Sequence, residues 1–211
     1  RSSDLLFFGQ ASLLPDENEE PYVQELKREY AHLRTKYQLQ PISRVHWRFS
    51  RLRPAHFPTL RVAQLAQLFF QSDYIFSRLL NAQNLRDTRQ FLQVRLHSFW
   101  DNHYRLEKPS KTTQAKTLGS SAIDALIINA LAPMLYAKGT FRLQPQFCTR
   151  TLAFLSGLEA EENHYTRQWA EWEIAPNSAL ESQGLLHWHK HYCSQHRCLE
   201  CPAGKRILRH K

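Results

Sequence analysis

The sequence predicts a mainly α-helical protein: a single irregular multi-helix domain over residues 1–211, around a central buried hydrophobic helix. The chain has 211 residues, of which 42% are hydrophobic and 12% aromatic, enough to build a sizeable core. Apolar residues recur at spacings of three and four between loops marked by proline, as in amphipathic helices. Only 6 glycines are present, which disfavours architectures rich in β-hairpins.

The N-terminal third predicts two helices joined by an irregular segment. Pro21 follows an acidic loop and suits the first turn of a helix that reaches about Tyr37. Residues 41–58 contain three prolines, so they are expected to lie over the helices as an extended segment. Pro58 then opens a helix whose packed face is expected to contain Val62, Leu65, Ala66 and Phe69.

The remaining sequence predicts five further helices. Residues 86–100 form an apolar helical face through Leu92, Leu96 and Phe99. Residues 118–139 are the central helix, apolar on nearly every side. Ser121 with Asp124 resembles a capping box there, and Gly139 lies where a helix-ending glycine is expected. The last three helices are expected over 145–157, 159–173 and 178–192.

Composition also predicts where the protein is found. The most apolar stretch, residues 122–135, is interrupted by Asp124, Asn129 and Pro133 and falls short of a bilayer span. The 4 cysteines come without a signal peptide or an evident disulfide framework, as in proteins of a reducing compartment. We therefore expect a cytoplasmic protein with no membrane partner.

The strongest signal is the separation of charge. The formal net charge is +9, which favours anionic partners. No acidic residue occurs from Tyr30 to Ser72, where basic residues alternate with aromatic Tyr37, Trp47 and Phe49. Such a composition is typical of surfaces that contact phosphates and stack on bases. The candidate nucleic-acid-binding residues are Arg44, Arg48, Arg51, Arg53 and Arg61. An alternative is that Arg53 and Arg61 pair inward with carboxylates such as Asp124.

A second basic patch lies at the C-terminus, where Glu200 is the one opposing acid. Charged tails of this kind are usually solvated. Its members are Lys190, Arg197, Lys205, Arg206, Arg209 and Lys211.

The same region contains three of the cysteines. Cys198 and Cys201 form a C-x2-C pair, and Cys193 precedes them. Together with His189, which would share a helix face with Cys193, they provide the three thiolates and one imidazole of a structural zinc site. His191 and His196 are alternative fourth ligands. One C-x2-C pair without a second is a weak signal, so we favour ordinary thiols and no cofactor, with structural zinc as the alternative.

No motif in the chain indicates catalysis. The sequence contains no G-x-S-x-G elbow, P-loop or dinucleotide glycine fingerprint. Glu161 and His164 have the Glu-x-x-His spacing of di-iron bundles, but the chain has one copy, so we expect a polar helix face. His97, Asp101 and His103 are expected to be polar residues at a helix end rather than an acid-base group.

Four stretches resemble the bacterial family catalogued as domain of unknown function 2851. They are "LLFFGQASLL" (5–14), "RLRPAHFPTLRVAQLAQLF" (51–69), "LGSSAIDALIINALAPMLYAKG" (118–139) and "YCSQHRCLECPAG" (192–204). Members of that family are longer than this chain, so the resemblance implies its C-terminal half. It assigns no function, and it implies that an N-terminal region of the same protein is a partner.

Three hypotheses about function follow. The leading one is a non-catalytic basic helical module that binds nucleic acid or another polyanion. The second is part of a nucleic-acid-processing, nuclease-like enzyme whose catalytic residues lie in the N-terminal region. The third is a structural interaction domain whose arginines are paired internally.

Overall fold

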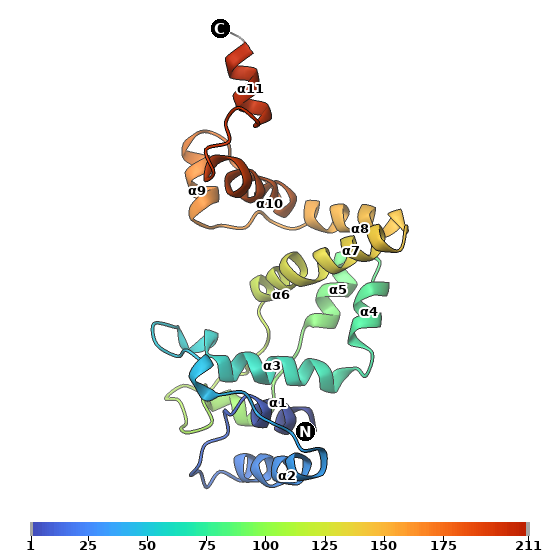
Figure 1. Cartoon of the computed structure of the whole chain (residues 1–211). Helices are drawn as coiled ribbons and strands as arrows, with labels where there is room; N and C mark the ends of the chain where they lie inside the picture. The colour runs from blue at the N-terminus through green and yellow to red at the C-terminus, as the bar shows by residue number, and fades with distance from the viewer. Residues whose placement is uncertain (1, 210–211) are drawn as a thin grey trace. The chain divides into compact units, whose positions relative to one another are not determined.

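The computed structural model describes residues 2–209 and confirms a mainly α-helical fold (Figure 1). Its described residues contain no β-strand, only two isolated bridges. The α-helices are α1 (Ser2–Gln10), α2 (Pro21–Tyr37), α3 (Pro58–Gln71), α4 (Ile75–Asn81), α5 (Leu85–Leu92), α6 (Ser120–Leu126), α7 (Ala132–Phe141), α8 (Pro145–Ser156), α9 (His164–Glu171), α10 (Ala179–Trp188) and α11 (Pro202–Arg209). Short 3₁₀ turns are η1 (Arg44–His46), η2 (Pro54–His56) and η3 (Ser98–Asn102), and π-helical turns are η4 (Ile127–Leu131) and η5 (His189–Cys193).

The chain forms two compact units. Unit 1 comprises Arg1–Ala82 and Arg86–Ile123, and unit 2 comprises Gln83–Leu85 and Asp124–Lys211. The single domain over residues 1–211 stays a prediction.

The core of unit 1 lies where α1 packs between α2 and α3 (Figure 1). Phe8 and Trp100 are fully buried there and stack with ring centroids 5.5 Å apart. Gly9 permits the close approach of α2, because a Cβ at this position would lie 2.1 Å from Cδ2 of the Tyr30 ring. The N-terminal helix is therefore an integral part of the core.

The predicted helix that begins at Pro58 is present, but its buried face differs from the expected one. Val62 and Ala66 are buried, whereas Leu65 and Phe69 are 43% and 48% exposed. The face is completed by Leu60, Ala63, Gln64 and Leu68. Hydrophobic periodicity therefore located the helix correctly but identified only two of the four predicted residues as members of its buried face.

The predicted helix over 86–100 is wrong beyond Leu92, where α5 ends. Residues 94–96 are extended because they pair with residues 116–118: the Leu96 N–H donates to the Lys116 carbonyl (3.0 Å), and the Leu118 N–H donates to the Val94 carbonyl (3.1 Å). Leu92, Leu96 and Phe99 are nonetheless all buried.

The apolar stretch near the middle of the chain forms one continuous helix, Ser120–Phe141, made of α6, η4 and α7. Asp124, Asn129 and Pro133 do not interrupt it. It is buried along Ile127, Ile128, Leu131 and Leu135 and exposed at Leu126, Met134 and Tyr136. Among the described residues it is the one helix long and apolar enough to cross a membrane. Core helices of other proteins meet the same criteria, so this finding assigns no location.

Gly139 is not the C-cap that the sequence predicts, because α7 continues to Phe141 and ends at Arg142. It lies where α7 packs on α8: a Cβ at Gly139 would be 2.5 Å from Sγ of Cys148. Cys148 is half-buried at this contact rather than part of an enclosed core.

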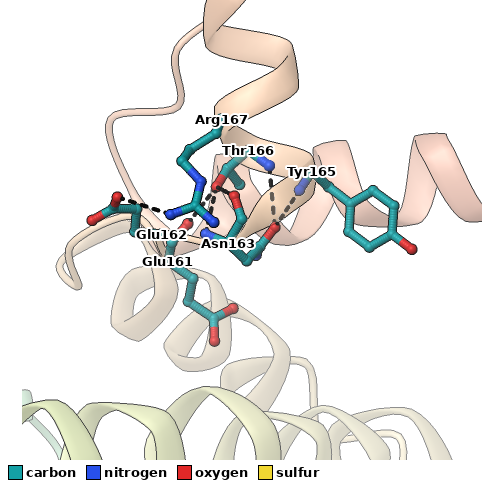
Figure 2. A network of polar contacts seen from close by, with 6 residues as sticks. All are labelled: Glu161, Glu162, Asn163, Tyr165, Thr166 and Arg167. Carbon is teal, nitrogen blue, oxygen red and sulfur yellow. Dashed lines mark hydrogen bonds and ion pairs between the residues drawn. The ribbon is translucent and has the colours of Figure 1, made fainter.

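Two helices of unit 2, α9 and α10, begin at side-chain caps, Asn163 and Ser178. Asn163 caps α9: its side chain accepts from the N–H groups of Tyr165 and Thr166, and the Thr166 hydroxyl accepts from the Asn163 N–H, which makes a capping box (Figure 2). Glu161 accepts hydrogen bonds from Asn129 and Gln183. The Glu161-x-x-His164 spacing thus belongs to a helix start and its polar surroundings.

Candidate functional site

The candidate site is a basic strip in unit 1, defined as Arg44, Arg48, Arg51, Arg53 and Arg61. The first four lie in residues 41–57, which form the predicted irregular segment with only η1 and η2 as regular turns. Two anchors hold this segment against the end of α1. The Trp47 indole donates to the Ala11 carbonyl (2.6 Å), and the Ile42 N–H donates to the Gln10 carbonyl (2.9 Å).

Three arginines of the strip present free guanidinium groups. Arg48, Arg51 and Arg53 are exposed, and their side chains have no hydrogen bond or ion pair with any residue among 2–209. Arg51 adopts a left-handed backbone conformation, with φ of 61°. Arg44 differs, because it pairs with Glu107 at 2.9 Å. This ion pair is largely exposed and contributes little stability.

Arg61 lies in the first turn of α3 and is held by neutral partners. One Nη donates to Oε1 of Gln64 (2.9 Å), and the other lies 3.1 Å from Nδ1 of His56. Gln64 is itself buried and donates to the Thr117 carbonyl (3.3 Å). The predicted pairing of Arg61 with Asp124 joins different units and stays a prediction.

The aromatic residues that alternate with the basic residues in the sequence do not form the expected stacking platform. Trp47 and Phe49 pack against the core of unit 1. Phe49 is also covered by Arg105, whose guanidinium lies 4.6 Å from the Phe49 ring centroid and 4.7 Å from that of Phe57. Of the three predicted rings, Tyr37 is the exposed one, at 60%.

Arg105 and Lys108 are basic residues of this site that the sequence analysis missed. Both line an open pocket of about 310 Å³ together with Pro54 and Phe57. They come from the loop that follows η3, about fifty residues further along the chain than the strip. The "YRLEK" sequence contains an adjacent glutamate, so its charge pattern alone did not mark it.

A second pocket of about 370 Å³ is lined in part by Ala55 and His56 of η2. It is named the Arg61 pocket here, and its lining includes His56, Arg61, Lys116, Ser120 and Ser121. No carboxylate lines either pocket among the residues that the structure describes. Residues of η2 therefore line both pockets, together with cationic side chains from other segments.

The predicted zinc ligands lie in unit 2, and the described residues contain no group of three side chains arranged to hold a metal. Cys193 and Cys198 are exposed, whereas Cys201 is buried and accepts from the Trp188 indole (3.2 Å). Hydrogen bonding from the Gly204 N–H, with help from Trp188, lowers the pKa of Cys201. Burial raises the pKa of Cys193, with smaller effects of the other two thiols. His189 contacts the Tyr165 ring. A structural zinc site stays a prediction.

The C-terminal basic patch differs from the strip. Arg197 donates to Glu200 within the turn between η5 and α11, with Nε 3.1 Å from Oε2. Lys190, Lys205, Arg206 and Arg209 are exposed. Lys211 lies outside the described residues.

His97, Asp101 and His103 do not form an acid-base group. Nδ1 of His97 accepts from the Phe99 N–H (3.2 Å), which caps η3. His103 is buried and stacks on Phe99 at 4.0 Å, with Nδ1 2.9 Å from the Phe99 carbonyl. Each imidazole thus organises the turn around η3.

Comparison with known proteins gives one family. The model of the family described as "Protein of unknown function (DUF2851)" matches residues 2–164, which include all of unit 1 after its first residue. The cysteine cluster lies beyond the matched residues. No curated protein and no solved structure gave a match. The chain belongs to the DUF2851 family, whose function is not known.

Proposed function

We propose that the chain is a basic helical module that binds nucleic acid through the basic strip. The observation that carries the proposal is the exposure of Arg48, Arg51 and Arg53 with no carboxylate partner among residues 2–209. Guanidinium groups that are already paired with carboxylates must give up those partners before they bind phosphate, whereas these three are free.

The binding mode follows from the two half-buried aromatic rings that lie within the strip segment. Because Trp47 and Phe49 pack against the core, they are not available to stack on unpaired bases. Guanidinium contacts to phosphate oxygens contain no direct sequence information. The module therefore binds the phosphate backbone without base selection.

The alternative of internally paired arginines applies to two members of the strip. Arg44 has Glu107, and Arg61 has Gln64 and His56. These contacts favour a structural contribution from Arg44 and Arg61, while Arg48, Arg51 and Arg53 remain the binding residues. No arrangement of described residues favours the nuclease-like alternative, which needs residues outside this chain.

The test is a salt titration of binding to a labelled duplex by fluorescence anisotropy. Replacement of Arg48, Arg51 and Arg53 by glutamine is expected to weaken binding about tenfold or more at low salt. The slope of log K against log salt is expected to fall by about 0.9 for each lost phosphate contact. Arg28→Gln, an exposed position on α2, is the control. Absence of binding by the wild type at low salt, or an unchanged slope in the triple variant, would overturn the proposal.

A further inference from the structure

The Arg61 pocket adjoins the basic strip. Ala55 and His56 of η2 line the pocket, and Arg53 is the N-cap residue of η2. Arg53 of the strip is therefore only two residues before the first η2 residue that lines the pocket. The opposite wall comes from residues 114–117 and the first residues of α6.

The pocket is cationic and has a fixed charge at its wall. Lys116 is 5% exposed, and its Nζ donates to the carbonyls of Trp100 (2.6 Å) and Asp101 (2.9 Å) and lies 4.2 Å from the Tyr104 ring centroid. Burial lowers the pKa of Lys116, and the negative charge of Asp101 opposes that shift. The carbonyl and ring contacts also favour the ammonium form. Arg61 provides a second positive charge.

Arg61 retains donors for a ligand. A guanidinium has five N–H groups, of which Gln64 and His56 occupy two, so three remain. Since arginine only donates, Nδ1 of His56 must be the acceptor in this contact. With Nδ1 as the acceptor, the ring N–H of His56 is at Nε2 and is a further donor.

Two serine hydroxyls are further hydrogen-bond donors in the Arg61 pocket. Ser120 and Ser121 are exposed and have no side-chain partner among residues 2–209. A guanidinium, an imidazole N–H and two hydroxyls, with no carboxylate among the lining residues, suit an anion that has several acceptor oxygens. A phosphate monoester has three terminal oxygens and a charge of roughly −1.5 to −2 at neutral pH, more than the single charge of a diester.

We propose that the Arg61 pocket binds the terminal phosphate monoester of a nucleic-acid strand whose backbone lies on the basic strip. This inference rests on the proposed function and adds to it a preference for phosphorylated ends. The strip binds diesters along the strand, and the pocket selects the end.

The experiment compares labelled oligonucleotides of one sequence that have a 5′-phosphate, a 3′-phosphate or hydroxyls at both ends. Anisotropy with the full chain is expected to show about tenfold tighter binding to one phosphorylated end, as a charge-assisted contact provides. The double variant Ser120→Ala with Ser121→Ala is expected to lose this preference and keep the affinity for hydroxyl ends, and Arg61→Gln is expected to lose the preference as well. Arg28→Gln is the matched control and is expected to keep both.

The outcomes separate the two proposals. Equal affinity for phosphorylated and hydroxyl ends overturns the pocket assignment and leaves the strip as a binding surface. A preference that persists in both pocket variants also overturns it. If inorganic phosphate raises the melting temperature through Arg61 but end phosphates give no preference, the pocket binds free phosphate and the assignment to strand ends is wrong. No binding of any oligonucleotide overturns both proposals. Should Arg61→Gln fail to fold, the serine double variant decides.

Discussion

The two basic stretches of the chain look alike in sequence and differ in structure. In the basic strip, Trp47 and Ile42 hold the backbone against α1, while Arg48, Arg51 and Arg53 are exposed and have no partner among residues 2–209. In the C-terminal patch, Arg197 is paired with Glu200, Lys190 lies in η5, and Lys205, Arg206 and Arg209 lie on the short helix α11. A count of charges thus does not distinguish the two, whereas anchoring and pairing do.

The largest expected effect comes from removing the anchor of the strip. Trp47→Ala is expected to lower the free energy of unfolding by about 2 kcal/mol, because it deletes a half-buried indole and its hydrogen bond to Ala11. Urea unfolding of the purified chain measures this. Trp47→Phe keeps an aromatic ring but loses the indole N–H, and it is expected to lower the free energy of unfolding by about 1 kcal/mol. A Trp47→Ala variant as stable as the wild type would show that the strip is not anchored, and the comparison would fail.

A smaller effect is expected from removing three charges at the C-terminus. The variant Lys205→Gln, Arg206→Gln, Arg209→Gln changes the net charge as much as the triple variant of the strip. It is expected to weaken duplex binding only about threefold at low salt, and less at physiological ionic strength because distant charges are screened. Anisotropy at two salt concentrations is the measurement. A loss equal to that of the strip variant would mean that net charge, rather than anchored geometry, determines binding.

The smallest effect is expected from metal removal. Because residues 2–209 contain no preformed group of three ligands, a chelator is expected to leave the melting temperature of unit 2 unchanged. Elemental analysis of protein purified without chelator is the companion measurement. Stoichiometric zinc, with a fall in melting temperature on chelation, would identify Cys193, Cys198 and Cys201 as ligands. Zinc would then anchor the backbone of the C-terminal patch, and anchoring would no longer distinguish this patch from the strip.

Local features of the sequence were enough to locate several elements. Pro21 and Pro58 begin α2 and α3 as predicted, since proline fits the first turn of a helix and needs no N–H partner there. Prolines also marked residues 41–58 as irregular. The helix expected over 86–100 was broken by pairing with residues 116–118, a contact between distant segments that periodicity does not report.

The sequence alone identified part of the candidate site. The absence of acidic residues from Tyr30 to Ser72 identified the arginines of the strip, but it did not show which of them are paired. Glu107, Gln64 and His56 decide that for Arg44 and Arg61. Arg105, between Phe49 and Phe57, was missed because its partners are about fifty residues away in the chain.

The sequence by itself determined the helical class, the family and the excess of positive charge, because helix signals and composition depend on residues close together in the chain. Only the tertiary structure decided which guanidinium groups remain free, which aromatic rings are covered and where a pocket opens beside η2. Those properties depend on contacts between segments far apart in sequence, and the free energy of such contacts is set by packing and desolvation in the folded chain.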